Sequence, residues 1–211
     1  LEAKPTRGAG TGGDPKRSRT VAEENLPTLK HACEGVDVVF ILAGLGGGAG
    51  TGISPVLAQA ARESGALVLA FVAMPFDCEG NRRLKQAQQG LEQLKNAADG
   101  VICLPNQEIL KLIDEKTSVV DTFNILNGLL AEGVNGVWRL MARKGLIEIH
   151  YADLCSLLRE RRGDSSFATA EASGATRSRE VMDKLFAHPM LDGGKTLAES
   201  DAVLVSLTGG P

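Results

Sequence analysis

Apolar and polar positions alternate in blocks along the first half of the chain, and this pattern predicts an α/β fold. Unbroken apolar runs of strand length cover residues 38–42, 66–74 and 101–104. Such runs are typical of parallel strands that are covered on both faces. Segments in which apolar residues recur at helical spacing separate the runs. The order strand, helix, strand therefore predicts right-handed crossovers in a parallel sheet.

The same pattern predicts where the helices of the first half begin and end. A polar helix is expected over 16–29. The helix after the first strand is expected to begin at Pro55, with Ser54 as its N-cap, and to end at Gly65. A third, amphipathic helix is expected to close at Gly100, directly before the third strand.

The second half of the chain begins with a helix of unusual length, expected over 118–144. Its apolar residues cover more than one face, which predicts that it is buried between two layers or domains. Beyond it, a strand over 165–174, a helix over 175–185 and a strand over 202–207 are expected.

A glycine-rich segment joins the first strand to the next helix. Without a Cβ, its backbone can adopt positive φ and approach a ligand closely. It delivers that ligand to a helix N-terminus, where free N–H groups and the helix dipole favour phosphate. The segment therefore predicts a phosphate site built on Gly44, Gly46, Gly47, Gly48, Gly50 and Gly52.

Two common phosphate motifs can be weighed against this segment. A Walker loop would need a lysine, and none lies between Lys30 and Lys85. Gly44, Gly46 and Ala49 satisfy the weaker G-x-G-x-x-A pattern, so a Rossmann NAD(P)-dependent oxidoreductase stays an alternative. That alternative expects an acidic residue at the end of the second strand, where position 74 is Met, and it ranks third.

The string GLGGGAGTG resembles the GGGTGTG signature of the tubulin/FtsZ family, with Ala49 where the family has Thr. The upstream segment GAGTGGDP resembles the family loop that faces the terminal phosphate. The resemblance implies two phosphate-binding segments, formed by Gly46, Gly47, Gly48, Ala49, Gly50, Thr51 and Gly52 and by Gly10, Thr11, Gly12 and Gly13.

Residues for the rest of a nucleotide also match the family. PFDCEGNRR resembles its PFxxEGxxR motif, in which Glu79 would grip ribose hydroxyls and Arg83 would lie near the phosphates. The amide of Asn106, which follows the third strand, would bond the guanine as both donor and acceptor. The further nucleotide-binding residues that this resemblance implies are Pro75, Glu79, Arg83, Asn106, Phe123 and Asn127, the last two through stacking on the base and pairing with it.

The segment GLIEIHYADLC resembles the loop that one family subunit inserts into the nucleotide site of its neighbour. Asp153 keeps an aspartate that would position the attacking water, whereas Glu148 and His150 replace an asparagine and a second aspartate. A largely neutral histidine can order a water but does not supply the lost negative charge. The alternative is that these are surface residues and that Asp153 is an ordinary helix cap.

The resemblance implies a three-layer, Rossmann-like α/β fold of the tubulin/FtsZ GTPase type, with a long central helix and the start of a second domain. The expected divisions are 1–35, the phosphate loop and lead-in helix; 36–117, part of the nucleotide-binding domain; 118–144, the central helix; and 145–211, the inserted loop and the second domain.

The implied function is a GTPase that binds GTP or GDP with Mg²⁺ and polymerises head to tail in bacterial cell division. Hydrolysis would be completed in trans, and the partners would be further copies of the chain and other division proteins. A filament-forming relative with little hydrolysis is the first alternative.

Composition limits the partners and the location that this function can have. A formal net charge of -3 gives no reason to expect a nucleic-acid partner. No apolar run reaches the roughly 20 residues that span a bilayer, so no membrane insertion is expected. The chain is expected to be cytoplasmic, at the division site. Its cysteines lack metal or redox spacing and are expected to be buried thiols, at Cys33, Cys78, Cys103 and Cys155.

The chain begins at Leu1 rather than at Met, and it is expected to be a fragment truncated at both ends. The family sheet would then lack its first strand. The strand over 38–42 would be left with an unpaired edge, which favours association with another chain.

Overall fold

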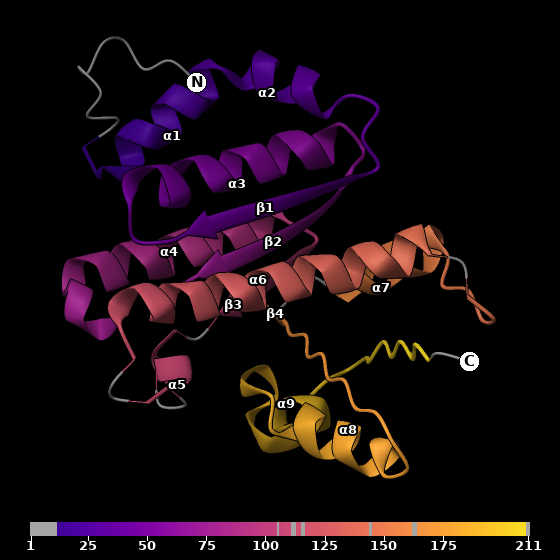
Figure 1. Cartoon of the computed structure of the whole chain (residues 1–211). Helices are drawn as coiled ribbons and strands as arrows, with labels where there is room; N and C mark the ends of the chain where they lie inside the picture. The colour runs from indigo at the N-terminus through magenta and orange to yellow at the C-terminus, as the bar shows by residue number, and fades with distance from the viewer. Residues whose placement is uncertain are drawn as a thin grey trace.

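A computed structural model describes residues 12–104, 106–110, 113–114, 117–143, 145–161 and 164–209. Helices and strands alternate through the first half, and helices dominate the second (Figure 1). The elements are α1 (Pro15–Glu24), α2 (Leu26–Cys33), β1 (Val38–Gly44), α3 (Gly48–Glu63), β2 (Leu67–Ala73), η1 (Asp77–Glu79), α4 (Asn81–Ala97), β3 (Gly100–Leu104), α5 (Asn106–Leu110), α6 (Val119–Ala142), α7 (Tyr151–Arg161), β4 (Asp164–Ser165), α8 (Arg177–Phe186), η2 (Pro189–Gly194) and α9 (Lys195–Ala198).

The strands form one parallel sheet in the order β1-β2-β3-β4. In its register Val38 pairs with Leu67 and Leu69 pairs with Gly100. The predicted strands of the first half are therefore present, each within two residues of its expected bounds. β1 lies at an edge of the sheet that the described residues form, and Leu42 on it is 55% exposed. The expectation of an unpaired edge agrees with this arrangement.

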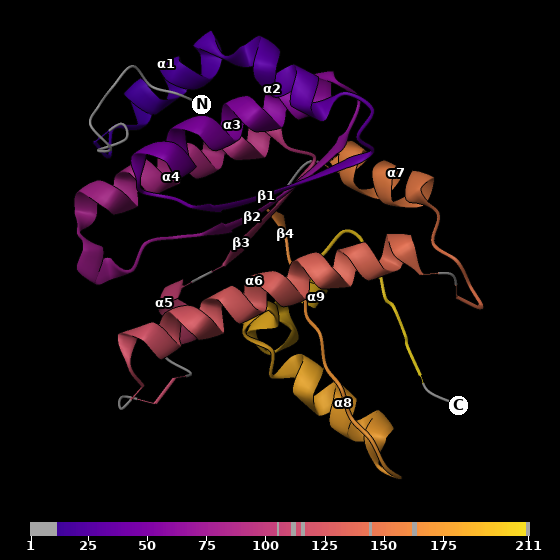
Figure 2. The same cartoon turned by 45° about the horizontal axis from the view of Figure 1, so that its top comes forward.

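Helices cover both faces of the sheet (Figure 2). Alternate residues of β2 point to opposite faces. Val68, Ala70 and Val72 pack in the core beneath α3 and α4. Leu67, Leu69 and Phe71 pack in a second core against α6 and α7, and all six side chains are buried. Burial of each larger side chain contributes roughly 1.5–3 kcal/mol, so β2 is the centre of the fold.

α1 and α2 form an outer layer on α3 (Figures 1 and 2). The contact is very close: a Cβ on Gly52 would lie 2.2 Å from the carbonyl oxygen of Pro15 and 2.8 Å from Cβ of Ser18. The helix expected over 16–29 is two helices, because Asn25 interrupts it and Pro27 starts the second. The Asn25 amide donates to the Val21 carbonyl at 2.8 Å, which closes α1.

The start of α3 differs from the prediction. The helix begins at Gly48, with Gly47 as its N-cap, and Pro55 lies inside it. Pro55 lacks the N–H that would bond the Thr51 carbonyl, and a proline ring crowds that carbonyl, yet α3 continues to Glu63. Ser54 is not a cap, since its hydroxyl donates to the Gly50 carbonyl at 2.6 Å.

Gly100 also has another role than predicted. α4 ends at Ala97, and Gly100 is the first residue of β3. A Cβ at this position would lie 2.9 Å from Cδ2 of Leu69 and 3.2 Å from Cδ2 of Leu158. The glycine therefore allows close packing of α7 on the sheet instead of terminating a helix.

α6 has the predicted length, and Ser118 caps it by accepting a hydrogen bond from the Asp121 N–H at 3.1 Å. Burial on more than one side is not found in the part of the chain that the structure describes. Only Thr122, Leu126 and Gly133 of this helix are buried. The large apolar side chains that stay exposed are Val119, Val120, Phe123, Ile125 and Trp138.

The two strands predicted downstream are wrong. Of the first, expected over 165–174, only Ser165 is in a strand, as the second residue of β4, and residues 202–207 form none. An apolar pattern makes a strand only where a neighbouring strand accepts its hydrogen bonds. The predicted helix is present as α8. No described helix is both long and apolar enough to cross a membrane.

Replacing Gly50 by alanine should destabilise the protein by about 1–3 kcal/mol, the usual cost of overpacking. A Cβ there would lie 2.0 Å from the carbonyl oxygen of Gly44, a backbone atom. Gly128→Ala is the matched control, since no atom lies within 4 Å of its Cβ position and alanine favours a helix by up to about 1 kcal/mol. Urea unfolding measures both, and equal effects of the two substitutions would contradict the packing argument.

Candidate functional site

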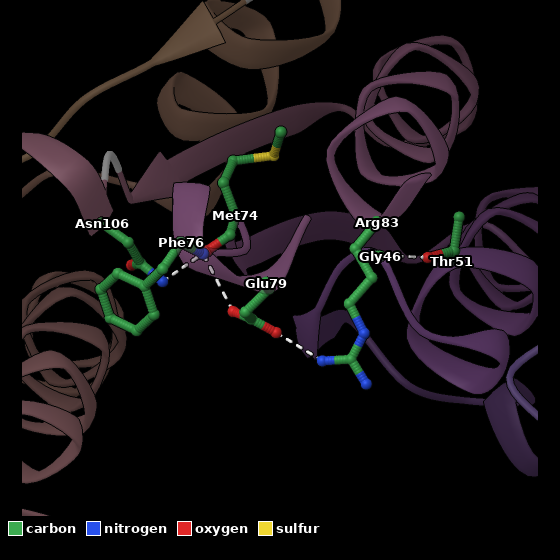
Figure 3. A network of polar contacts seen from close by, with 7 residues as sticks. All are labelled: Gly46, Thr51, Met74, Phe76, Glu79, Arg83 and Asn106. Atoms are coloured by element: carbon green, nitrogen blue, oxygen red, sulfur yellow. Dashed lines mark hydrogen bonds and ion pairs between the residues drawn. The ribbon is translucent and has the colours of Figure 1, made fainter. Parts of the chain in front are cut away.

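The candidate site lies at the carboxyl ends of β1, β2 and β3, which a parallel sheet brings to one edge. β1 ends at Gly44, β2 at Ala73 and β3 at Leu104. The segment that follows each strand contains residues that the sequence assigned to the nucleotide. Figure 3 shows polar contacts within the first two segments and one, from Asn106 to Met74, that joins the third segment to the second.

The glycine loop between β1 and α3 is held by defined contacts. The Leu45 N–H donates to the Ala73 carbonyl at 2.9 Å. The Gly46 N–H donates to Oγ1 of the buried Thr51 at 2.8 Å. Gly46 has φ of 93°, and a Cβ on it would lie 3.0 Å from the Arg83 carbonyl oxygen and 3.3 Å from Cγ of Pro75. Both the conformation and the space therefore require glycine.

The first turn of α3 is suited to an anion. Gly47 is the N-cap, no side chain caps the helix there, and open space surrounds its Cβ position. The first N–H groups of a helix have no intrahelical acceptor, and the helix dipole adds partial positive charge. α3 is 16 residues long. A phosphate can approach this turn as closely as the backbone allows.

The segment after β2 is ordered by Glu79. One carboxylate oxygen accepts from the Phe76 N–H at 2.9 Å, and the other pairs with the Arg83 guanidinium (Figure 3). Gly80, with φ of 96°, then starts α4. The side chains of Glu79 and Arg83 are 28% and 57% exposed, so their ion pair contributes on the order of 0–1 kcal/mol. Such a pair can exchange partners when a ligand arrives.

Asn106, at the start of α5, reaches back to β2. Its Nδ2 donates to the Met74 carbonyl (Figure 3). Its Oδ1 is buried and has no hydrogen-bond partner among the described residues. An unpaired buried acceptor costs roughly 1–3 kcal/mol, which a ligand N–H would recover. Asn106 is therefore suited to bind the donor edge of a base.

Phe123 and Asn127 lie near the start of α6. The Phe123 ring packs edge to face on Phe76, with centroids 5.7 Å apart and planes at 77°, and Phe123 stays 48% exposed. Asn127 is exposed one helical turn further along. The ring contact connects α6 to the segment after β2, although no described contact joins Asn127 to Asn106.

The upstream glycine segment is described only in part. Gly10 and Thr11 lie outside the described residues. Gly12 and Gly13 form an exposed turn, with φ of 64° and 77°, directly before α1. Because Pro15 crowds Gly52, this turn lies beside the first turns of α3. The position agrees with a second phosphate segment.

Glu148, His150 and Asp153 lie elsewhere, and all three are exposed. Asp153 accepts from the His150 N–H at 3.0 Å and so caps α7. Two further hydrogen bonds attach α7 to the amino ends of strands. The hydroxyl of the next residue, Tyr151, donates to the Asp37 carbonyl at 2.7 Å, and Arg159 donates to the Gly65 carbonyl at 2.9 Å.

The glycine loop and these three residues are therefore at opposite edges of the sheet. Asp37 precedes β1, and Gly44 ends it. Seven residues of strand at about 3.3 Å each separate the two edges by roughly 20 Å. One chain does not bring the two sets of residues together.

Several functional contacts were not visible in the sequence. These are the hydroxyl of Thr51 on the glycine loop, the carbonyl of Met74 and the ring of Phe76. Phe76 lies inside the PFDCEG string, which was its only signal. Cys78 in the same string is exposed, so the expectation of four buried thiols is wrong at this position. Cys33 is buried and Cys103 and Cys155 are partly buried.

Comparison with known proteins gives consistent matches. Residues 1–114 match the Tubulin/FtsZ family, GTPase domain. The cell division protein FtsZ of Rhizobium radiobacter is 38% identical over 210 residues, which are 100% of this chain and 36% of that protein. FtsZ of Buchnera aphidicola subsp. Acyrthosiphon pisum is 38% identical over 205 residues, 97% of this chain and 53% of the relative.

A solved structure gives the same result. A chain of the empty FtsZ dimer of M. jannaschii superposes on this chain with a TM-score of 0.80 at 34% identity. The superposition covers 89% of this chain and 54% of the FtsZ chain. The sequence given therefore spans between about a third and about half of the proteins that it matches.

Thiol alkylation tests the geometry of the site directly. Burial, which outweighs the opposing charge of Lys95, raises the pKa of Cys103 to about 11. Only the thiolate attacks an alkylating reagent, so at pH 8 we expect the exposed Cys78 to react at least roughly tenfold faster than Cys103. Raising the pH towards 11 should reduce the difference between the two alkylation rates, because more of Cys103 becomes thiolate. Mass spectrometry of timed samples, with Cys78→Ser as control, measures both rates, and faster labelling of Cys103 would contradict the structure.

Proposed function

Because this chain belongs to the tubulin/FtsZ family, we propose that the full-length protein containing it binds GTP and GDP and hydrolyses GTP. The observation that carries the proposal is the meeting of three segments at one sheet edge: the glycine loop, the Glu79–Arg83 segment and Asn106. Each is suited to a different part of a guanine nucleotide. The proposed function is that of a cell-division GTPase, because the matching family model is a GTPase domain and the similar proteins are cell division proteins.

The phosphates would bind at the N-terminus of α3 and at the turn around Gly12 and Gly13. Backbone N–H groups from 47 to 50 would bond phosphate oxygens, and the helix dipole would favour their charge. Arg83 would leave Glu79 and add a guanidinium, which suits phosphate through parallel N–H donors. Glu79, freed of its partner, would accept from ribose hydroxyls.

The base would lie between Asn106 and the start of α6. The unpaired Oδ1 of Asn106 would accept from guanine, and adenine offers no ring N–H donor on the same edge. The exposed face of Phe123 would stack on the base, and the Asn127 amide would pair with it.

Mg²⁺ would enter with the nucleotide. The described residues contain no group of three or more His, Cys, Asp or Glu side chains that is suited to a metal ion. The ion would therefore be held mainly by phosphate oxygens, whose charge it would neutralise. In this account the chain contributes the phosphate site and no metal cage of its own.

Hydrolysis would be completed by a second subunit. The residues proposed to position water, Asp153, His150 and Glu148, lie at the opposite edge of the sheet from the glycine loop. Head-to-tail stacking would place the amino edge of one copy against the carboxyl edge of the next. The same stacking, repeated, makes a filament. Other division proteins at the division site in the cytoplasm would be its further partners.

A filament former with little hydrolysis stays the second candidate, because His150 does not supply the negative charge expected there. An attacking water needs a nearby base, and a neutral imidazole orders water without that charge. The oxidoreductase alternative is not favoured, since the family match covers more than half of the chain.

Guanine preference tests the base site. Asn106→Ala and Asn127→Ala should each reduce the preference for GTP over ATP by roughly tenfold, since a lost hydrogen bond to the base costs about 1–3 kcal/mol. Asn135→Ala, at another exposed asparagine of α6, is the control and should keep the preference. Competition binding measures the ratio. Unchanged selectivity in both site variants would remove these residues from the base site.

GTP turnover tests the hydrolytic residues. The unmodified protein should turn GTP over slowly, and His150→Asp should speed it by roughly 10²-fold or more, because it restores a positioned charge. Turnover should rise steeply with protein concentration, since an isolated subunit has no complete site.

Asp153 needs a paired design because it also caps α7. Asp153→Asn keeps an acceptor for the His150 N–H but loses the charge, whereas Asp153→Ala loses both. Both variants should nearly abolish turnover without weakening nucleotide binding. Loss in the alanine variant alone would assign Asp153 to capping, and slower turnover in His150→Asp would show that His150 already acts as the base.

A further inference from the structure

We propose that Thr51 is a positioning residue that fixes the phosphate loop and is not itself a phosphate ligand. Its hydroxyl sets the conformation of Gly46, and its methyl group sets the separation of α3 and α4. The inference rests on the proposed nucleotide binding and assigns a role within that site.

The hydrogen bonds of Thr51 bracket the loop. Its Oγ1 accepts from the Gly46 N–H at 2.8 Å, and its own N–H donates to the Gly47 carbonyl at 3.3 Å. Thr51 is 4% exposed, so neither bond competes with bulk water. The N–H groups of Gly46 and Thr51 are thus both engaged within the protein. Those of residues 47–50, at the start of α3, have no intrahelical acceptor and are the donors that would meet phosphate.

The hydroxyl bond fixes a backbone conformation that needs support. Gly46 has φ of 93°, which glycine reaches freely but does not hold without contacts. On its other side Gly46 lies against the Arg83 carbonyl and Pro75. Without the Thr51 acceptor, Gly46 would still lie against Arg83 and Pro75, but it would lose the hydrogen bond that orients its N–H. The donors that follow would then be less well aligned.

The methyl group of Thr51 contacts a second helix. A Cβ on Gly90 of α4 would lie 2.5 Å from Cγ2 of Thr51 and 3.4 Å from its Cα and Cβ. Gly90 is buried, and only glycine fits beside this methyl group. α4 also carries Arg83, which crowds Gly46. Thr51 therefore contacts both Gly46 and Gly90, and α4 connects Gly90 to Arg83, which lies against Gly46. Figure 3 shows the bond between Gly46 and Thr51 and the position of Arg83.

The experiment separates the two groups of the side chain. Thr51→Val keeps the shape and removes the acceptor, and Thr51→Ser keeps the hydroxyl and removes the methyl group. The probes are GDP and GMP, measured on the full-length protein by displacement of a fluorescent guanine nucleotide. Thr51→Val should weaken GDP binding by roughly tenfold or more, and it should narrow the preference for GDP over GMP. Thr51→Ser should keep the GDP affinity and the preference for GDP over GMP within about threefold, because its hydroxyl still accepts from the Gly46 N–H.

A double substitution tests the methyl contact. Gly90→Ala should weaken GDP binding, because its Cβ displaces Thr51. Thr51→Ser in the same protein should restore it, because removal of Cγ2 leaves the new Cβ with ordinary contacts of 3.4 Å. This arm remains informative if Thr51→Val does not fold.

Three results would overturn the inference. They are an unchanged GDP affinity in Thr51→Val, an equal loss of GDP and GMP affinity in that variant, and no restoration of Gly90→Ala by Thr51→Ser. Failure of the unmodified protein to bind either nucleotide would instead overturn the proposed function, and the inference with it.

Discussion

The backbone of Gly44 approaches α3 so closely that a Cβ on Gly50 would lie 2.0 Å from its carbonyl oxygen. Three other positions around the first turns of α3 are also restricted. Gly52 lies against α1, Gly90 against Thr51, and Gly46 against Arg83 and Pro75. Each approach brings main chain within van der Waals distance of a neighbour, and together they set where the helix starts. Gly46, Gly50 and Gly52, which appear to serve a ligand, thus serve packing first, whereas Gly47 has open space at its Cβ position.

This dual use explains why the start of α3 was misplaced and the strands were not. Unbroken apolar runs identify a buried strand directly, because both faces of the sheet are covered. Glycine and proline suggest a loop by propensity, yet α3 begins at Gly48 and continues through Pro55, and at Gly50 the close approach of the Gly44 backbone leaves room for glycine alone. The stretches 165–174 and 202–207 failed for a related reason: their pattern is that of a strand but, apart from the pairing of Ser165 with β3, no described strand lies beside them.

The candidate site was predictable as a list of residues and not as a set of contacts. Resemblance indicated Glu79, Arg83 and Asn106, whereas their partners depend on geometry that no spacing encodes. Glu79 bonds the Phe76 N–H because η1 turns back on itself, and Asn106 reaches Met74 because β2 and β3 pair in one register. Glu79 and Arg83 bind each other, so a ligand that binds Arg83 must replace an existing contact, whereas the Oδ1 of Asn106, unpaired among the described residues, can accept from a ligand without losing one.

The attachment of α7 to the sheet has a mechanical consequence. Tyr151 and Arg159 tie it to backbone carbonyls at the amino ends of β1 and β2, while the glycine loop continues from the carboxyl end of β1. A pulling force applied between the amino and carboxyl ends of the strands would run parallel to them. It would load all the hydrogen bonds between neighbouring strands at once, in shear, instead of breaking them one after another. A subunit built in this way would resist being pulled lengthwise far better than being peeled from its side.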